Sequence, residues 1–367
     1  MLIKAALTHN LGEGFQIEEV ELNGPEQDEV LIEIVSCGVC HTDAVARDQL
    51  IPVPLPAVLG HEGAGIVQKV GSGVKGIEPG DHVVLSFSSC GKCENDHTGK
   101  PYVCKDFNLL NFGGIMNDGT KRLSQGDKEL STFFGQSSFA THATVNVRNV
   151  VVIDKDVDLE IVGPLGCGFQ TGVGTVLNGL KPEIGSSLVV FGMGSVGFTA
   201  LMGARIAGCE KIIAVGGSQT KLNMAEEFGA THTINYKEVK DVVDEIKRIT
   251  DGGADYTVET TAVPAIVNQA MYSLKVLGTC AIVGATGDVT LNIQNALMAE
   301  GKTMKGFIEG NSIPQIFIPK LIRYYKEGRF PIDRLVTKYR FDEINQAFED
   351  SHSGKVIKPV LVMKNLK

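Results

Sequence analysis

One stretch of the sequence constrains the fold more than any other: residues 187–208 run from an apolar segment through a glycine-rich turn into a helical segment. The turn, FGMGSVG, places three glycines in the spacing G-x-G-x-x-G: Gly192, Gly194 and Gly197. In this context the glycines let the backbone approach a pyrophosphate, and the helix N-terminus offers amide donors to it. We therefore expect a dinucleotide site that includes Ser195 and Val196, with a tight turn that binds no ligand as the alternative.

The same alternation of apolar strand and helix continues to about residue 305. Apolar runs such as KIIAVGG and GTCAIVGA follow helical segments such as TKLNMAEEFGA and VVDEIKRIT. Repeated strand–helix units predict a doubly wound α/β domain with a parallel sheet and helices on both faces. Before about residue 152, short β-branched runs between glycines predict strands and loops, and the polar stretch 105–136 predicts a long loop.

Length, charge and cysteine content limit the class of protein. A chain of 367 residues is long enough for two domains. Its net charge of −9, without a basic block, disfavours nucleic acid as a partner. No apolar run is long enough for a bilayer, and the first residues, MLIKAALTHN, lack the pattern of a signal peptide. We expect a cytoplasmic protein whose eight cysteines are metal ligands or core residues rather than disulfides.

The end of the second strand of the dinucleotide unit bears on the choice of cofactor. An NAD site typically carries an acidic residue there, whereas this chain has Gly216, Gly217 and Ser218. Without that carboxylate a 2′-phosphate is not repelled, and Ser218, Gln219 and Lys221 are available to bind it. The pattern favours NADP, but because no arginine is present as a two-pronged phosphate ligand, NAD stays open.

Three residues in glycine-rich surroundings have the chemistry of a catalytic zinc site: Cys40 in SCGVCHTDAV, His61 in LGHEGAG and Cys167 in GPLGCGFQTG. Two thiolates and an imidazole suit Zn²⁺ and leave a fourth position open. Each residue taken alone is more often a core cysteine or a hydrogen-bonded histidine. Sequence spacing does not show that the three meet.

A second cysteine group is local. The segment CGKCENDHTGKPYVC contains Cys90, Cys93 and Cys104. A compact cysteine set on a loop typically encloses a structural zinc ion. Either Asp96 or His97 supplies a suitable fourth ligand.

These motifs together resemble one known family. The segment GHEGAGIVQKVGSGV fits the zinc signature of medium-chain alcohol dehydrogenases, G-H-E-x-x-G-x-x-x-x-x-G-x-x-V, at every fixed position. The chain resembles these enzymes over nearly its whole length. The resemblance implies a GroES-like β-barrel catalytic domain, formed by residues 1–168 with 306–367, and a Rossmann domain, 169–305.

The resemblance also implies metal ligands. Cys40, His61 and Cys167 are then the ligands of the catalytic zinc. The family's structural zinc has the ligand spacing C-x₂-C-x₂-C-x₇-C, which this chain matches except that Asp96 replaces the third cysteine. The resemblance therefore leaves the occupancy of that second site open.

Further roles follow from the same resemblance. Glu62 is implied as a carboxylate that approaches the metal, Asp43 as the acceptor that orients His61, and Thr42 as the acceptor of the alcohol proton. His41 and Lys358 are implied near the pyrophosphate. Lys221 is implied beside the adenosine ribose.

The resemblance extends to substrate class. Cys167 favours the alcohol dehydrogenase branch over the polyol branch, which has glutamate there. Val45 and the segment FFGQSSFATHATV resemble aryl-alcohol (benzyl-alcohol) dehydrogenases. Candidates to line an aromatic pocket are Phe87, Phe133, Phe134 and Phe169, with ordinary core residues as the alternative for each. We expect reversible hydride transfer between a primary aryl alcohol and NAD(P), catalysed by a homodimer or homotetramer. The alternatives are aliphatic or allylic alcohols and aldehydes, or a non-catalytic zinc-stabilised nucleotide-binding protein.

Overall fold

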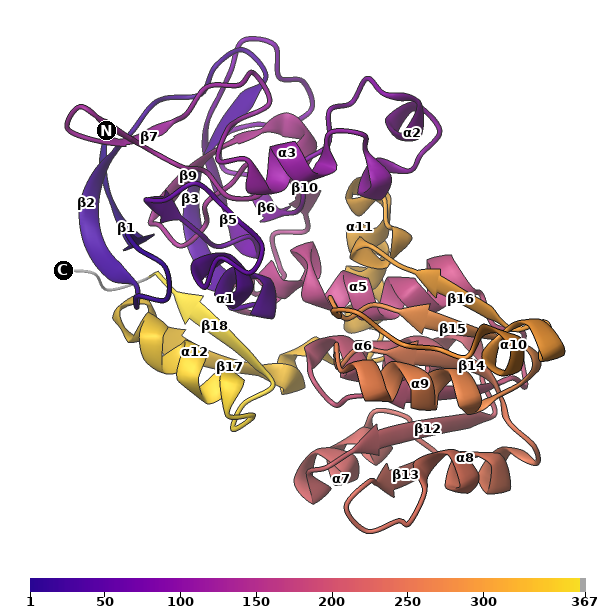
Figure 1. The fold of residues 1–367 in the computed structure, drawn as a ribbon. Coiled ribbons are helices and arrows are strands. Elements are labelled where there is room, and N and C mark those ends of the chain that lie inside the picture. The colour runs from indigo at the N-terminus through magenta and orange to yellow at the C-terminus, as the bar shows by residue number, and fades with distance from the viewer. Residues whose placement is uncertain (364–367) are drawn as a thin grey trace. The chain divides into compact units, whose positions relative to one another are not determined.

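The computed structural model describes residues 1–363, and their contacts divide into two compact units. Unit 1 contains Met1–Gly168 and the segment that begins at Ile313, and unit 2 contains Phe169–Ser312 (Figure 1). The sequence pattern places the second boundary after residue 305, within unit 2 as the contacts define it. The last four residues of the expected catalytic domain, 364–367, lie outside the described residues.

Unit 1 is built from β-strands whose order in the sheets differs from their order in the chain. Its strands are β1 Leu2–Thr8, β2 Gln16–Leu22, β3 Glu29–Gly38, β4 Ala57–Val58, β5 Gly63–Val70, β6 His82–Leu85, β7 Leu123–Gln125, β8 Lys128–Leu130, β9 His142–Asn146, β10 Val150–Ile153, β17 Val336–Arg340 and β18 Lys358–Val362. Among residues 1–363 they form one sheet in the order β4-β1-β2-β7-β8 and another in the order β10-β6-β5-β3-β18-β17, with β9 paired to β3.

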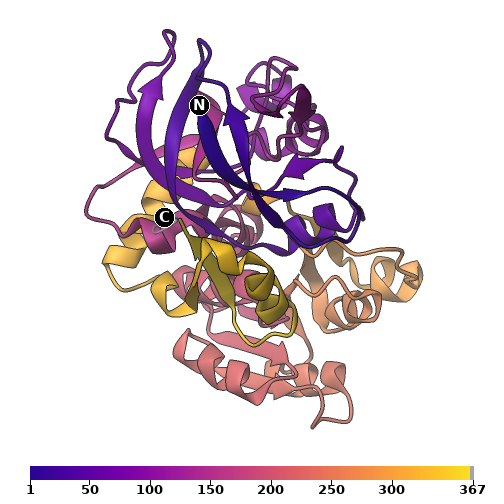
Figure 2. The ribbon, with the colours of Figure 1, turned by 90° about the vertical axis from the view of Figure 1, so that its left-hand side faces the viewer.

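The strand β3 pairs with three other strands of the second sheet. It pairs antiparallel with β5, β9 and β18, and its apolar run VLIEIV is buried along most of its length. The pairing of Leu361 in β18 with Cys37 in β3 makes the C-terminal segment an integral part of unit 1. Figure 2 shows this segment in yellow against the indigo strands. Both ends of the chain therefore contribute to one core.

The helices of unit 1 are α1 His41–Arg47, α2 Glu94–His97, α3 Phe107–Phe112, α4 Leu159–Val162, α11 Pro314–Lys326 and α12 Ile344–His352. The helices before the second boundary are short, with four to seven residues each, whereas α11 after it has 13 residues. The prediction of one long loop over 105–136 is wrong, because this stretch contains α3, β7 and β8. Its apolar residues pack: Leu110 and Leu123 are buried, and so is Leu130.

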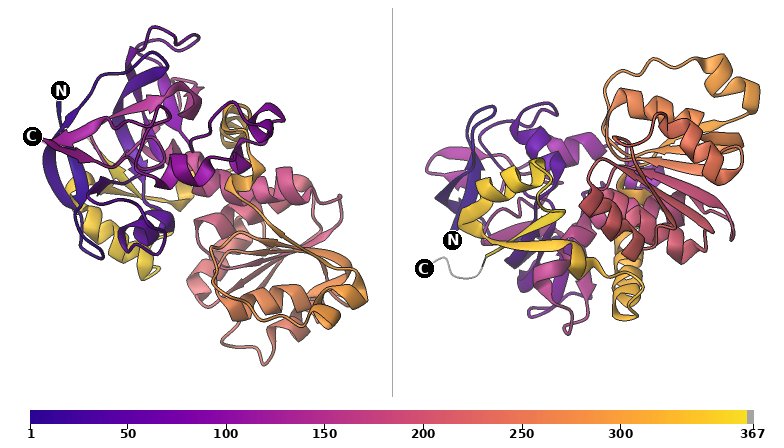
Figure 3. Two further views of the ribbon diagram at one scale, coloured as in Figure 1. Left: turned by 45° about the horizontal axis from the view of Figure 1, so that its top comes forward. Right: turned by 90° about the horizontal axis from the view of Figure 1, so that it is seen from below.

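Unit 2 confirms the predicted doubly wound parallel sheet. Its strands are β11 Ser187–Phe191, β12 Lys211–Gly216, β13 His232–Asn235, β14 Ala254–Glu259, β15 Leu274–Ile282 and β16 Thr303–Gly306. Their order is β13-β12-β11-β14-β15-β16, and every neighbouring pair is parallel. The helices are α5 Gly168–Gly174, α6 Ser195–Ala207, α7 Gln219–Glu227, α8 Val242–Thr250, α9 Pro264–Tyr272 and α10 Ile293–Ala296. Figure 3 shows helices on both faces of this sheet.

Two further expectations concern the whole described chain. All eight cysteines lie within residues 1–363, and none of them forms a disulfide. Within residues 1–363, no helix combines the length and the apolar character that a bilayer crossing requires.

An aromatic cluster in unit 1 fixes the backbone just before His61. Phe139 is fully buried, and its ring centroid lies 5.6 Å from that of Phe15 and 5.9 Å from that of Phe348. Gly60 has φ +89°, and a Cβ there would lie 2.3 Å from the amide nitrogen of Phe139. Only glycine fits this position, so the chain reaches His61 along a backbone path that other residues would block.

Candidate functional site

Four side chains of unit 1 meet around one point. Cys40, His61, Glu62 and Cys167 each offer one ligand atom, and these atoms all lie within 4.8 Å of one another. Cys40 caps α1 two residues after the end of β3, and His61 lies two residues before the start of β5. Because Cys37 in β3 pairs with Gly63 in β5, the loop after β3 and the loop before β5 lie side by side. The structure thus brings together the three residues whose convergence the spacing alone did not show.

Asp43 organises this group. Its buried carboxylate lies 2.9 Å from Nδ1 of His61 and accepts hydrogen bonds from the backbone N–H groups of Cys40 and Gly60, both at 3.1 Å. The other ring nitrogen of His61, Nε2, is buried and has no hydrogen-bond partner among the described residues. A buried polar nitrogen without a partner is costly, whereas coordination of a cation would satisfy it.

The thiols beside His61 suit a cation. A hydrogen bond with Cys167 holds the pKa of Cys40 well below its usual range, against the opposing effect of burial. A thiolate is the form of cysteine that binds metals. The donor set of two sulfurs and an imidazole, with the orphaned Nε2, therefore fits the zinc ion that the sequence implied.

Glu62 and Lys358 form a buried ion pair next to the ligands. The ammonium of Lys358 lies 2.9 Å from both carboxylate oxygens of Glu62 and donates to the carbonyl of Val39 at 3.0 Å. Burial alone would lower the pKa of Lys358, but the Glu62 carboxylate raises it above its usual range. Glu62 also accepts a hydrogen bond from the backbone N–H of Gly168, which follows Cys167. The pair connects β18 to the loop that carries Cys167.

The first two residues of α1, His41 and Thr42, differ in their surroundings. The Thr42 hydroxyl oxygen is 3.7 Å from Sγ of Cys40, and the Thr42 side chain is half-buried. His41, the first residue of α1, is exposed. Thr42 is thus placed next to Cys40, whereas His41 is turned toward solvent within unit 1.

Aromatic packing and an amide complete the surroundings of His61. The ring of Phe134 stacks on the imidazole at 4.5 Å, and Phe133 meets it edge-on at 5.4 Å. Both rings are buried, so they act as core around His61. The amide of Gln136 donates to the His61 carbonyl at 3.1 Å. Sequence reasoning missed Gln136, although its position in FFGQSS, beside the two phenylalanines, was a usable signal.

The second cysteine group also converges. Cys90, Cys93, Asp96 and Cys104 each bring a ligand atom within 4.8 Å of the others. Oδ2 of Asp96 lies 2.9 Å from Sγ of Cys93 and 3.4 Å from Sγ of Cys90. His97 is exposed and lies outside this group. Of the two candidates that the sequence left open, the structure places Asp96 among the sulfurs, and three sulfurs with one carboxylate oxygen suit zinc.

The glycine turn of unit 2 has the geometry that its spacing predicts. Gly192 has φ +99°, and α6 begins directly after Gly194, at Ser195. A Cβ on Gly197 would lie 1.9 Å from the carbonyl oxygen of Gly192, whereas a Cβ on Gly194 would meet nothing within 4 Å. Gly197 therefore allows α6 to pack on the turn, and Gly194 leaves open space in front of the helix N-terminus.

The end of β12 carries the residues expected to select the cofactor. Gly216 ends β12, Ser218 precedes α7, and Lys221 is half-buried in α7, where burial lowers the pKa of its ammonium. A Cβ on Gly217 would lie 2.4 Å from the hydroxyl oxygen of Tyr236. Tyr236 also lines a cavity of about 270 Å³, and Gly192 of the glycine turn lines the same cavity.

Family models match both units of the chain. Residues 26–155 match the model described as alcohol dehydrogenase GroES-like domain, and residues 195–325 match the model described as zinc-binding dehydrogenase. A geraniol dehydrogenase from Castellaniella defragrans is 43% identical over 364 residues, which are 98% of this chain and 97% of the relative.

Solved structures agree over the full chain. An alcohol dehydrogenase zinc-binding domain protein from Burkholderia ambifaria superposes with a TM-score of 0.96 at 46% identity and covers 100% of both chains. A benzyl alcohol dehydrogenase from Acinetobacter calcoaceticus gives a TM-score of 0.95 at 44% identity and covers 99% of both chains.

The two glycines of the turn provide a matched test of the dinucleotide site. We expect Gly197→Ala to destabilise the protein by about 1–3 kcal/mol or more, because its methyl group overlaps a backbone carbonyl. Gly194→Ala should cost at most about 1 kcal/mol but weaken dinucleotide binding at least about tenfold, because its methyl group occupies the approach to the helix N-terminus. Denaturant unfolding and titration of NADPH fluorescence measure the two effects. Equal destabilisation by both variants, or unchanged binding by Gly194→Ala, would contradict this assignment.

Proposed function

Because the chain belongs to the zinc-dependent medium-chain alcohol dehydrogenases, we propose that it catalyses reversible hydride transfer between a primary alcohol and NADP. In this proposal Cys40, His61 and Cys167 hold the catalytic zinc. The observation that carries the proposal is the buried Nε2 of His61, which has no partner among the described residues and faces two thiols. The alternative of a non-catalytic zinc-stabilised nucleotide-binding protein is disfavoured by the named dehydrogenase relatives.

Each polar residue near the ligands has a task in this reaction. Zinc, when bound, supplies a Lewis acid for the oxygen of the alcohol or aldehyde. Asp43 fixes the imidazole of His61 with Nε2 directed at the metal. The Thr42 hydroxyl, next to Cys40, would accept the proton of the alcohol at its oxygen and release its own proton toward the ribose of the bound cofactor. Burial raises the pKa of Glu62, and the ammonium of Lys358 opposes this effect by placing a positive charge against the carboxylate.

The cofactor and assembly proposals extend the same reasoning. The glycine turn of unit 2 binds the pyrophosphate through the amides at Ser195 and Val196. NADP is favoured because Gly216, Gly217 and Ser218 bring no carboxylate to the ribose, and because Lys221 stands one turn into α7. We also propose a homodimer or homotetramer as the assembly.

For the substrate, we propose a primary alcohol whose neighbouring carbon is aromatic, with allylic alcohols as the second candidate. One full-length relative is a benzyl alcohol dehydrogenase and another a geraniol dehydrogenase. Benzyl alcohol and geraniol share an unsaturated carbon next to the carbinol. This shared chemistry supports a substrate whose developing carbonyl is conjugated.

The metal assignment is tested with two cysteines from the same unit. Cys167→Ala should remove one zinc ion per chain and lower alcohol oxidation at least about a hundredfold, as expected for losing charge stabilisation worth about 2.7–4 kcal/mol. Cys37→Ala is the control, since Cys37 is buried outside the ligand group. Metal analysis and initial rates measure both. If Cys167→Ala lost zinc and kept full activity, the enzyme mechanism proposed here would be wrong.

Cofactor preference is tested at Gly216. We expect wild-type kcat/KM to be higher for NADP than for NAD, and Gly216→Asp to reverse that order because a carboxylate repels the 2′-phosphate. A Cβ at this position would lie 3.3 Å from the flexible side chains of Leu222 and Met193, so substitution is sterically possible. Gly216→Ala, which adds the Cβ without the charge, should preserve the NADP preference. A hundredfold preference of the wild type for NAD would refute the NADP proposal.

The substrate proposal is tested with alcohols of matched size. We expect kcat/KM for benzyl alcohol to exceed that for cyclohexylmethanol at least about tenfold, a difference of about 1.4 kcal/mol in transition-state binding. Geraniol and its saturated analogue citronellol form the second pair. A higher value for geraniol than for benzyl alcohol would favour the allylic candidate, and a preference for both saturated alcohols would contradict both.

A further inference from the structure

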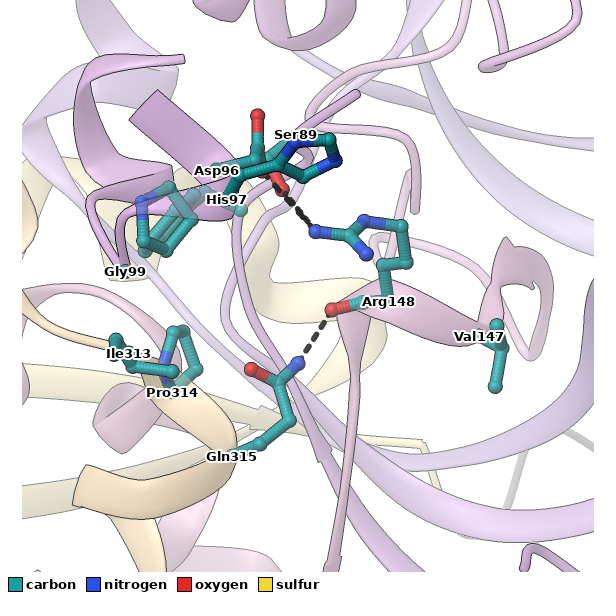
Figure 4. A pocket seen from close by; sticks show the side chains of 11 residues that line it. Ser89, Asp96, His97, Gly99, Val147, Arg148, Ile313, Pro314 and Gln315 are labelled. Carbon is teal, nitrogen blue, oxygen red and sulfur yellow. Dashed lines mark hydrogen bonds and ion pairs between the residues drawn. The ribbon is translucent and has the colours of Figure 1, made fainter. Parts of the chain in front are cut away.

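The carboxylate of Asp96 has two oxygens with different partners. Oδ2 faces the sulfurs of Cys93 and Cys90, as described above. Oδ1 lies 3.1 Å from Nη2 of Arg148, on the opposite side of the carboxylate (Figure 4). The Asp96 side chain is only 1% exposed. One oxygen is therefore directed at the cysteine group, and the other is occupied by a guanidinium.

Arg148 is itself held in place from several directions. Its Nη2 also donates to the Ser89 hydroxyl at 3.1 Å, and its carbonyl accepts a hydrogen bond from the side chain of Gln315 at 2.5 Å. The guanidinium lies across Gly91, where a Cβ would be 2.5 Å from Cζ of Arg148. Gly91 is thus required for the arginine to cross the turn between Cys90 and Cys93.

Replacing a cysteine ligand by an aspartate changes the number of donor atoms that the side chain offers to a metal. A thiolate presents a single donor atom, whereas a carboxylate has two oxygens and binds through one or both of them. The formal charge of the ligand set stays the same, because a thiolate and a carboxylate each carry one negative charge. A guanidinium that binds Oδ1 leaves Oδ2 as the one free donor of Asp96 and offsets part of the negative charge of the site.

We propose that Arg148 is the positioning residue that makes Asp96 an effective fourth ligand of the second zinc site. Ser89 and Gln315 orient Arg148, and Arg148 orients Asp96. The inference rests on occupancy of this zinc site and is independent of the alcohol chemistry proposed for the first.

The surroundings of the Arg148–Asp96 ion pair predict how its loss would change the rate of zinc release. Ser89, Asp96, Arg148 and Gln315 line a cavity of about 450 Å³ in unit 1, and the Arg148 side chain is 41% exposed. Solvent and small chelators therefore reach the ion pair from this cavity. Without Arg148, Asp96 is free to turn away from the sulfurs toward water, so zinc should leave the site faster.

The test measures zinc release to the chelator 4-(2-pyridylazo)resorcinol from the full chain. The Cys167→Ala variant serves as the background, so that the zinc of the second site is the ion followed. Arg148→Gln should release this zinc at least about tenfold faster, within the range expected when a partner of a metal ligand is removed. Arg148→Lys keeps the charge but lacks the planar guanidinium that bonds Asp96 and Ser89 together. Its release rate should fall between those of Arg148→Gln and the parent.

A second pair of variants separates positioning from general loss of structure. In an Asp96→Cys chain the fourth ligand is a thiolate, so adding Arg148→Gln should change the release rate less than about twofold. Equal acceleration by Arg148→Gln with and without the Asp96→Cys substitution, or no acceleration in the chain that keeps Asp96, would overturn the role of Arg148. If the Cys167→Ala chain held no zinc while the wild type held one ion, the second zinc site itself would be refuted. That outcome would leave the proposed alcohol dehydrogenase function standing.

Discussion

The carboxylate of Asp43 is the interaction on which the rest of unit 1 depends. It is buried, and it bonds the imidazole of His61 and the backbone amides of Cys40 and Gly60. A buried charge is tolerated only when its hydrogen-bonding capacity is used, so these partners are held together as a set. In this way one side chain fixes the loop after β3, the loop before β5 and the orientation of the ring between them.

The same principle explains why the chain returns to unit 1 after unit 2. Lys358 in β18 supplies the positive charge for Glu62, whose second task is to accept the amide of Gly168 beside Cys167. Removing one partner of such a pair leaves an uncompensated buried charge, which costs about 3–5 kcal/mol. The terminal strand is therefore both a sheet partner of β3 and an electrostatic part of the ligand group.

In each of the two candidate metal centres, a neighbouring side chain orients one of the candidate ligands. The neighbour is acidic at the first centre and basic at the second. At the first, the imidazole of His61 is oriented by the carboxylate of Asp43. At the second, an anionic ligand, Asp96, is oriented by the cation Arg148. In each case the neighbouring side chain bonds one polar atom of the candidate ligand, Nδ1 of His61 or Oδ1 of Asp96, and leaves the other atom available to a metal. In the proposal made above, this arrangement fixes which oxygen of Asp96 is left to bind zinc where the related family has a cysteine.

Local sequence patterns determined the parallel sheet of unit 2, the glycine turn with its helix at Ser195, and the compact group from Cys90 to Cys104, because periodicity and short spacing act between chain neighbours. They did not predict α3 or the strands β7 and β8 within 105–136, whose apolar residues are few and become buried only against other segments. Tertiary structure alone decided that Cys167 meets Cys40 and His61, that Lys358 pairs with Glu62, and that Asp96 rather than His97 faces the sulfurs. These choices depend on the path of the folded backbone, which brings together side chains that no local pattern relates.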